Sequence, residues 1–294
     1  MSAAVRSLVM PLGVLALAGS LLVGSGCVAR DSREKPVLDS AGGTSPPPTS
    51  AVPTTLDAAS LVRERSLALG EIGGRAFRAT YGSLHDADFL SAARNGRNAL
   101  VISQFNEYEH PKCQAASCIV GCADRLTALG RAVDDCLTPL SPRARERFLA
   151  AIESTAAGRP GEVVGVRLDL DPEARAAFPV DEVYVVLFQC GAWPDWKVES
   201  LRAGLGEVFR RAAAERVDTL VVPALTYNWE DGESVPLRDL YREVFDAAAS
   251  CAKEGTVLLP LYDRWPTFVL EDAVGAIQET LGGGWGGAAE EPPG

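Results

Sequence analysis

Residues 201–225, LRAGLGEVFRRAAAERVDTLVVPAL, contain the two signals that decide the fold class. In the first part, apolar residues recur every three or four positions, which predicts an amphipathic helix with one buried stripe. These residues are Leu201, Leu205, Val208, Phe209 and Ala212. The last part holds a continuous apolar run at 220–222, the profile of a strand buried on both faces. A helix that leads into a buried strand predicts a sheet covered by helices.

The same alternation continues on both sides of this stretch. Three more strand-like apolar runs lie at residues 163–168, 183–188 and 257–262. Amphipathic helices are predicted at residues 237–248 and 270–281. Because helices separate the later strands along the chain, we expect those strands to be parallel.

In the first half of the folded region, the predicted strands are close together in the sequence. Residues 77–81 alternate apolar and polar side chains, and residues 99–102 form a short interior-strand run. Leucines within residues 56–69 predict a short surface helix, and another helix opens after Ser141 and Pro142. The predicted fold class is therefore α/β, with three layers: a mixed, mostly parallel sheet with helices on both faces.

The N-terminus has the pattern of a cleavable leader over residues 1–26. Arg6 is its only charge, and residues 8–23 are mostly apolar but short for a membrane span. Residues 22–27, LVGSGC, resemble the lipobox of a bacterial lipoprotein, with Cys27 as the lipid-attachment residue. We therefore expect an extracytoplasmic protein of the cell envelope, held at the membrane through its N-terminal lipid. The alternative is an ordinary secretory signal followed by an incidental cysteine.

Composition divides the rest of the chain into three parts. Residues 27–56 are rich in Pro, Ser, Thr, Gly and Ala, so they cannot bury enough apolar surface to order and predict a flexible tether. Residues 282–294, rich in glycine and ending in an acidic proline-containing run, predict a disordered tail. Residues 57–281 then form one α/β domain of ordinary size.

The charge of the chain argues against two classes of partner. The formal net charge is −11, and loss of Arg6 with the leader makes it −12. Nucleic acids and anionic membrane surfaces both attract positive surfaces, so we expect no nucleic-acid partner. The simplest consequence of this negative charge is that it keeps the protein soluble.

Six of the seven cysteines follow Cys27. An even number in an oxidising compartment is compatible with disulfides but does not select their connectivity. Cys113, Cys118 and Cys122 lie near His110, yet their C-x4-C-x3-C spacing matches no common zinc pattern. We therefore predict no metal site and no cofactor.

Three segments that leave strand ends have unusual compositions. Ligands of open α/β sheets bind beyond the carboxyl ends of the strands, so these segments are the candidate ligand site. If all three segments leave the same edge of the sheet, the ring of Tyr262 lies opposite the side-chain amide of Asn106. The segments are residues 103–108, with Asn106; residues 226–234, with Thr226, Tyr227, Asn228 and Gly232; and residues 262–265, with Tyr262.

The order of these motifs resembles the macro domain, a family that binds ADP-ribose and whose enzymatic branches hydrolyse ADP-ribose linkages. The resemblance covers about residues 77–281, and residues 201–225 match it best. It implies that Asn106 lies near the last asparagine of the family's asparagine loop. It also implies that Tyr262 takes the place of the aromatic residue that stacks on adenine.

Two departures from the family pattern predict a degenerate site. The loop that should hold a diphosphate has one glycine, Gly232, and three neighbouring carboxylates that would repel a diphosphate. The aspartate that contacts adenine in the family is replaced within Gly82-Ser83-Leu84.

Three functions stay open on these residues. The first is an envelope lipoprotein that binds a nucleotide-like small ligand, or a protein partner, at the rim of the sheet. The second is an ADP-ribosyl hydrolase in which Asn106 and an acidic loop residue position water; since no nucleophile–base pair or metal triad is visible, we favour a binding module over an enzyme. The third is a structural or interaction lipoprotein in which Trp229 and Tyr227 close the site.

The resemblance implies one disulfide as well. It makes the strand after Asn98 a neighbour of the strand that starts near Val183. Cys190 then comes close to the loop that holds Cys113 and Cys118.

Overall fold

The computed structural model describes residues 56–85, 90, 96–106, 126–155, 158–189, 195–225, 235–251 and 253–282. The expected leader and Cys27 lie outside these ranges, as do residues 283–294. None of the helices within the described ranges combines the length and the apolar run that crossing a bilayer requires.

Seven strands form one sheet, and its mixed, mostly parallel character confirms the sequence prediction. Five neighbouring strands are parallel, and an antiparallel strand, β1 or β4, lies at each edge. In spatial order the strands are β1 (Ser66–Ile72), β2 (Arg75–Gly82), β7 (Gly255–Tyr262), β6 (Thr219–Val221), β3 (Asn98–Asn106), β5 (Glu182–Gln189) and β4 (Val163–Arg167).

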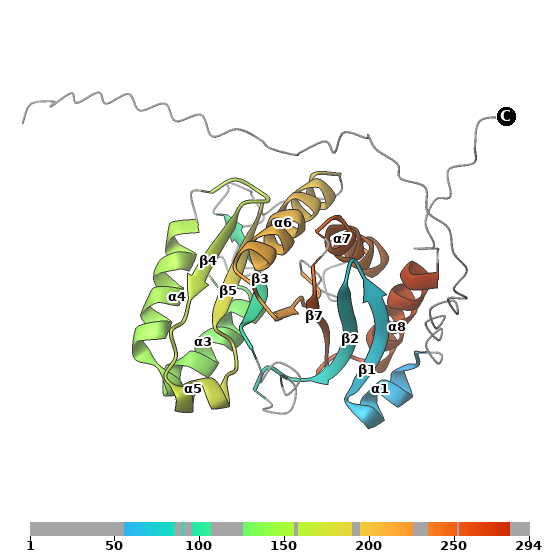
Figure 1. Ribbon diagram of the computed structural model, residues 1–294, viewed down its shortest axis with the longest axis horizontal. Helices are drawn as coiled ribbons and strands as arrows, with labels where there is room; N and C mark the ends of the chain where they lie inside the picture. The colour runs from blue at the N-terminus through green and yellow to red at the C-terminus, as the bar shows by residue number, and fades with distance from the viewer. Residues whose placement is uncertain are drawn as a thin grey trace, which may run out of the picture. The chain divides into compact units, whose positions relative to one another are not determined.

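Helices cover both faces of the sheet, which confirms the three-layer arrangement (Figure 1). One face packs against α1 (Ala58–Glu64), α6 (Asp195–Ala214), α7 (Leu237–Ser250) and α8 (Thr267–Gly282). The other face packs against α3 (Ala128–Leu140) and α4 (Pro142–Thr155), beside the short helix α5 (Pro172–Ala177).

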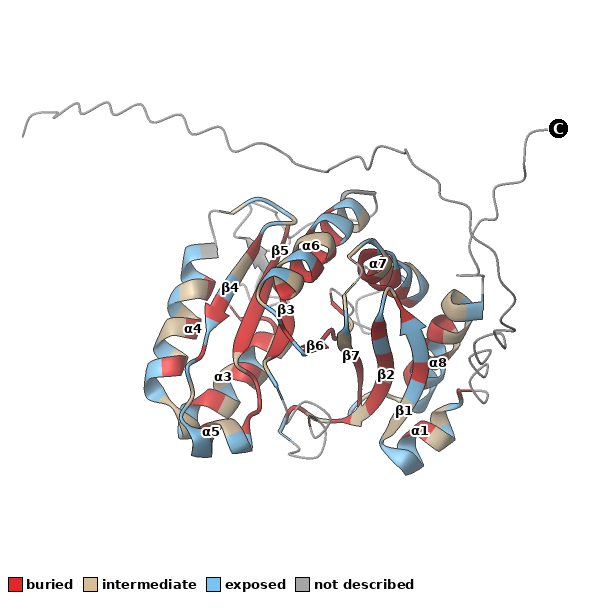
Figure 2. Cartoon of the chain, in the orientation of Figure 1, coloured by how far each residue is buried: buried red, intermediate tan, exposed pale blue. Residues whose placement is uncertain are grey.

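The alternation of side chains along each strand divides the core into two clusters. On β3, Ala99 and Val101 join the cluster under α6, α7 and α8, whereas Leu100 and Ile102 join the cluster under α3 and α4. The central strands are buried on both faces, and exposed residues lie on the outer sides of the helices and on the edge strands β1 and β4 (Figure 2). This double burial is why these strands have continuous apolar runs in the sequence.

The helix expected over residues 56–69 is wrong in its second half. Helix α1 ends at Glu64 because Arg65 adopts a left-handed backbone conformation with φ of 63°. Leu67 and Leu69 then belong to β1 instead. The register of β1 shifts between Ala68 and Gly70, and this irregularity removes the two-residue period that marks a strand.

An ion-pair network ties the amino ends of the strands to α6. The Arg97 guanidinium binds a carboxylate oxygen of Glu182 at 2.8 Å and one of Glu215 at 3.0 Å. The Tyr184 hydroxyl donates to Glu215 at 3.2 Å. Burial raises the pKa of Glu182 to about 7; the Glu215 carboxylate acts in the same direction, and Arg97 opposes both. One cation between two carboxylates therefore leaves Glu182 easy to protonate.

We predict that Gly204→Ala destabilises the domain by about 1–3 kcal/mol. A Cβ at Gly204 would lie 2.4 Å from Cγ1 of the buried Val186, so α6 would have to move away from β5. Gly206, in the same helix, has open space at its Cβ position. Gly206→Ala should therefore stabilise the protein by about 0.5–1 kcal/mol through helix propensity. Urea unfolding of both variants measures the difference, and equal effects would contradict this packing.

We also predict a pH-dependent contribution from Glu182. Its pKa in the folded state lies above the ordinary value of 4.5, so the stabilisation is complete below pH 4.5 and is lost as the pH rises through about 7. Glu182→Gln cannot titrate, and the difference in unfolding free energy between wild type and this variant should shrink across that window. Glu215→Gln, which removes the competing carboxylate, should move the window to lower pH. A difference in unfolding free energy that stays constant from pH 4.5 to 7.5 would contradict the raised pKa of Glu182.

Candidate functional site

The five parallel strands end at one edge of the sheet, here called the carboxyl edge. Gly82 pairs with Tyr262 at the ends of β2 and β7, and Asn106 pairs with Gln189 at the ends of β3 and β5. Strand β6 runs in the same direction between β7 and β3. The expectation that the three connectors leave the same edge is therefore confirmed, although residues 103–106 belong to β3 itself and not to its connector.

Strand β6 is much shorter than its two neighbours. Its last residue, Val221, pairs with Leu258 of β7 and with Leu100 of β3. Strand β7 continues to Tyr262 and strand β3 to Asn106, so both extend beyond β6 (Figure 2). The chain continues past Val221 through the buried residues Val222, Pro223 and Leu225, and the Val222 amide donates to the Leu258 carbonyl at 2.9 Å. The connector after β6 leaves between Tyr262 and Asn106.

Tyr262 faces the layer formed by α3 and α4, and its side chain is 9% exposed. The Trp265 ring meets it edge-on, with ring centroids 5.6 Å apart at 79°. The Arg264 guanidinium lies over the Tyr262 ring, 5.4 Å from the centroid. Burial raises the pKa of the Tyr262 phenol well above its usual range, although the Arg264 cation opposes this shift, so the phenol is neutral at physiological pH.

A tight turn produces this arrangement. The Trp265 amide donates to the Tyr262 carbonyl at 3.1 Å, and the Asp263 amide donates to the Gly82 carbonyl at 3.2 Å. The turn directs Arg264 back over the ring that precedes it. The sequence pattern marks residues 262–265 as a site segment, but it gave no role to Arg264. The position of Arg264 two residues after Tyr262 was the one feature that could have indicated this contact.

Of the other predicted site residues, only Asn106 lies within the described residues. The backbone of Asn106 ends β3 beside Gln189. Thr226, Tyr227, Asn228 and Gly232 lie outside the described residues, and so do the neighbouring carboxylates of that loop. The structure thus brings Asn106 and Tyr262 to one edge, on the strands that flank β6.

Helix α3 begins at the same edge. The Thr127 hydroxyl donates to the Ser103 carbonyl near the end of β3 at 2.9 Å, and it accepts the Gly130 amide at 3.1 Å. This N-cap fixes the start of α3 to β3. A threonine immediately before a helical run is the sequence feature that predicts such a cap.

His85, on the segment that follows β2, lies beside Cys136 of α3. The Cys136 sulfur, on α3, is 3.5 Å from Nδ1 of His85 and 3.8 Å from the Leu84 carbonyl oxygen. Burial raises the pKa of the Cys136 thiol to about 11, and Asp135 adds to the shift. The thiol is therefore protonated at neutral pH and is not an activated nucleophile.

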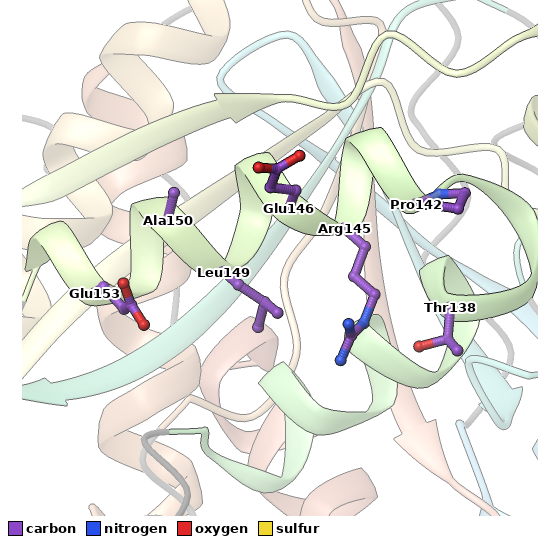
Figure 3. A pocket seen from close by; sticks show the side chains of 7 residues that line it. All are labelled: Thr138, Pro142, Arg145, Glu146, Leu149, Ala150 and Glu153. Carbon is purple, nitrogen blue, oxygen red and sulfur yellow. The ribbon is translucent and has the colours of Figure 1, made fainter.

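An open hollow of about 610 Å³ lies away from the strand ends, along α4 and the end of α3 (Figure 3). Arg145 in this hollow is held by Asp134 at 2.7 Å. Glu146 and Glu153 give it further charge, and Leu149 with Ala150 supplies its apolar part. None of its lining residues comes from the carboxyl edge, so we assign it no part in the site.

Within the described ranges, no group of three or more His, Cys, Asp or Glu side chains is placed to hold a metal ion. Cys136 and Cys251 are free thiols in the structure. Strands β3 and β5 are neighbours, as the expected disulfide requires. Cys190, Cys113 and Cys118 themselves lie outside the described residues, so the disulfide stays a prediction.

No family model matches this sequence. No curated protein matches it either. Among solved structures, the chain is similar to the Oceanobacillus iheyensis macrodomain with ADP, at 10% identity over 74% of this chain and 95% of that one, with a TM-score of 0.45. It is also similar to the macrodomain of Thermus aquaticus DarG, at 14% identity over 62% of this chain and 99% of that one, with a TM-score of 0.38. The Trypanosoma brucei macrodomain in complex with ADP is similar at 10% identity over 68% of each chain, with a TM-score of 0.43.

Proposed function

We propose that this domain binds a nucleotide-like small ligand at the carboxyl edge of the sheet, over the end of β6. The observation that carries the proposal is the short β6 between two longer parallel strands, which bring Tyr262 and Asn106 to either side of it. In open α/β sheets this is the part of the fold where ligands bind. An aromatic ring on one side suits a base, and an amide on the other suits a ribose or phosphate oxygen.

Binding is proposed rather than hydrolysis. In the described part of the carboxyl edge, the nearest pair of a nucleophile and a base is Cys136 with His85, and its thiol is neutral at physiological pH. The Tyr262 phenol is neutral as well. These two neutral groups provide no activated nucleophile in the described part of this edge.

We predict that the full-length chain, purified in detergent, binds ADP-ribose and ADP in isothermal titration calorimetry. Tyr262→Leu should weaken binding about tenfold or more, because aromatic–base stacking contributes about 1–3 kcal/mol. Asn106→Ala should weaken it through the lost amide contact. Tyr81→Leu is the matched control, since Tyr81 lies on the neighbouring strand but packs toward the opposite layer.

Thermal unfolding of each variant separates lost binding from lost folding. A wild-type chain that is folded yet binds neither nucleotide would refute the proposed function. Equal weakening by Tyr81→Leu would mean that the tyrosine effect comes from the fold and not from the site.

We further propose that Cys27 carries a lipid that holds the domain at a membrane of the cell envelope. The apolar leader and the LVGSGC motif support this assignment. Mass spectrometry of the N-terminal peptide, after expression in a bacterium, should find cleavage before Cys27 and an acylated cysteine. Cys27→Ser should abolish the acyl mass and release the protein from the membrane fraction. Cleavage elsewhere, with an unmodified Cys27, would favour the ordinary secretory signal.

A further inference from the structure

The Tyr262 ring is not an open platform for a base. Its side chain is almost fully buried, while Arg264, whose guanidinium lies 5.4 Å from the ring centroid, is exposed. The Arg264 guanidinium therefore covers one face of the ring. Trp265 meets the ring edge-on and occupies a further side. A base can stack on Tyr262 only after the guanidinium has moved.

The guanidinium is free to exchange partners. Among the described residues, no carboxylate forms an ion pair with Arg264, and its guanidinium contacts the Tyr262 ring instead. A cation over an aromatic ring at an exposed site is worth only about 0.5–1 kcal/mol. A guanidinium bound to a phosphate gains charge-assisted, often bidentate hydrogen bonds, which are stronger. An anionic ligand thus offers Arg264 a stronger partner than the ring, whereas a neutral ligand has to displace the guanidinium without compensation, at a cost of about 0.5–1 kcal/mol.

We propose that Arg264 is a specificity-determining cap on Tyr262, released by the phosphate of the ligand. The inference rests on the proposed function and narrows it. In the capped state the base-binding face is closed. A ligand opens it when its phosphate accepts Arg264 and its base takes the place of the guanidinium over the ring. The site therefore selects nucleotides over nucleosides, and the selection comes from one side chain.

The same fold supplies a matched control. Arg65 also lies over a tyrosine, Tyr81, with its guanidinium 5.4 Å from the ring centroid. Tyr81 precedes Gly82 on β2, but it packs toward the opposite layer from Tyr262. Arg65 has a left-handed backbone conformation, which asparagine tolerates better than most residues. Arg264→Asn and Arg65→Asn therefore remove the same stack at two places, one at the proposed site and one away from it.

The experiment measures the dissociation constants of adenosine and ADP by calorimetry for the full-length wild type, Arg264→Asn and Arg65→Asn. Arg264→Asn should tighten adenosine binding about two- to fivefold, the gain expected from removing the cap. It should also lower the preference for ADP over adenosine by about tenfold or more, because the phosphate loses its cation. Arg65→Asn should change neither quantity.

Each other outcome has a definite meaning. If the wild type binds ADP and Arg264→Asn keeps the same preference, the cap is refuted and the proposed function survives. If Arg264→Asn weakens both ligands equally, Arg264 contacts the base and is not a cap. If the wild type binds neither ligand but Arg264→Asn binds adenosine, the guanidinium closes the site permanently, and its release by phosphate is refuted. If neither protein binds either ligand, the proposed function fails together with the cap.

Discussion

The two halves of the sheet meet at the three residues of β6, and the whole carboxyl edge depends on this contact. Asp218, just before β6, strengthens it by bonding both neighbours. Its carboxylate accepts the Arg97 amide at 2.7 Å, and its carbonyl accepts the Thr256 amide at 2.8 Å. Gly96 is required beside it, since a Cβ there would lie 2.4 Å from the Asp218 carboxylate. Without this junction, β3 and β7 would not share an edge.

Charge is distributed differently at the two edges of the sheet. At the amino ends, charged groups neutralise each other: Arg97 binds Glu182, and Arg175 binds Asp181 at 2.6 Å. Such mutual pairing fixes strand ends and leaves little charge for a ligand. At the carboxyl edge Arg264 contacts a ring instead of a carboxylate. A cation held by a weak contact is the kind that a ligand can recruit, which is why we propose the carboxyl edge and not the amino edge as the binding site.

The sequence predicted those elements whose burial follows a simple period. Strands buried on both faces have continuous apolar runs, and helices packed on them have a stripe, so β5, β7 and α7 were expected close to their observed bounds. Helix α6 was expected from its stripe at residues 201–212 but starts earlier, at Asp195. Strand β1 was missed because it lies at the edge and carries an irregular register. Helix α5 was missed because it is only six residues long and has one buried side chain, Ala174, although Asp171 provides a regular N-cap.

The edge on which Tyr262 and Asn106 lie could be predicted from the sequence, but the surroundings of the Tyr262 ring could not. Tyr262 follows a buried strand, and the parallel topology alone brings it to the carboxyl edge with Asn106. What covers its ring depends on a turn in which Trp265 donates to the Tyr262 carbonyl, a hydrogen bond that no pattern of residue types specifies. In a sequence, Arg264 is simply a polar turn residue expected in solvent. Only the turn converts that arginine from a solvated charge into the group that any base must displace.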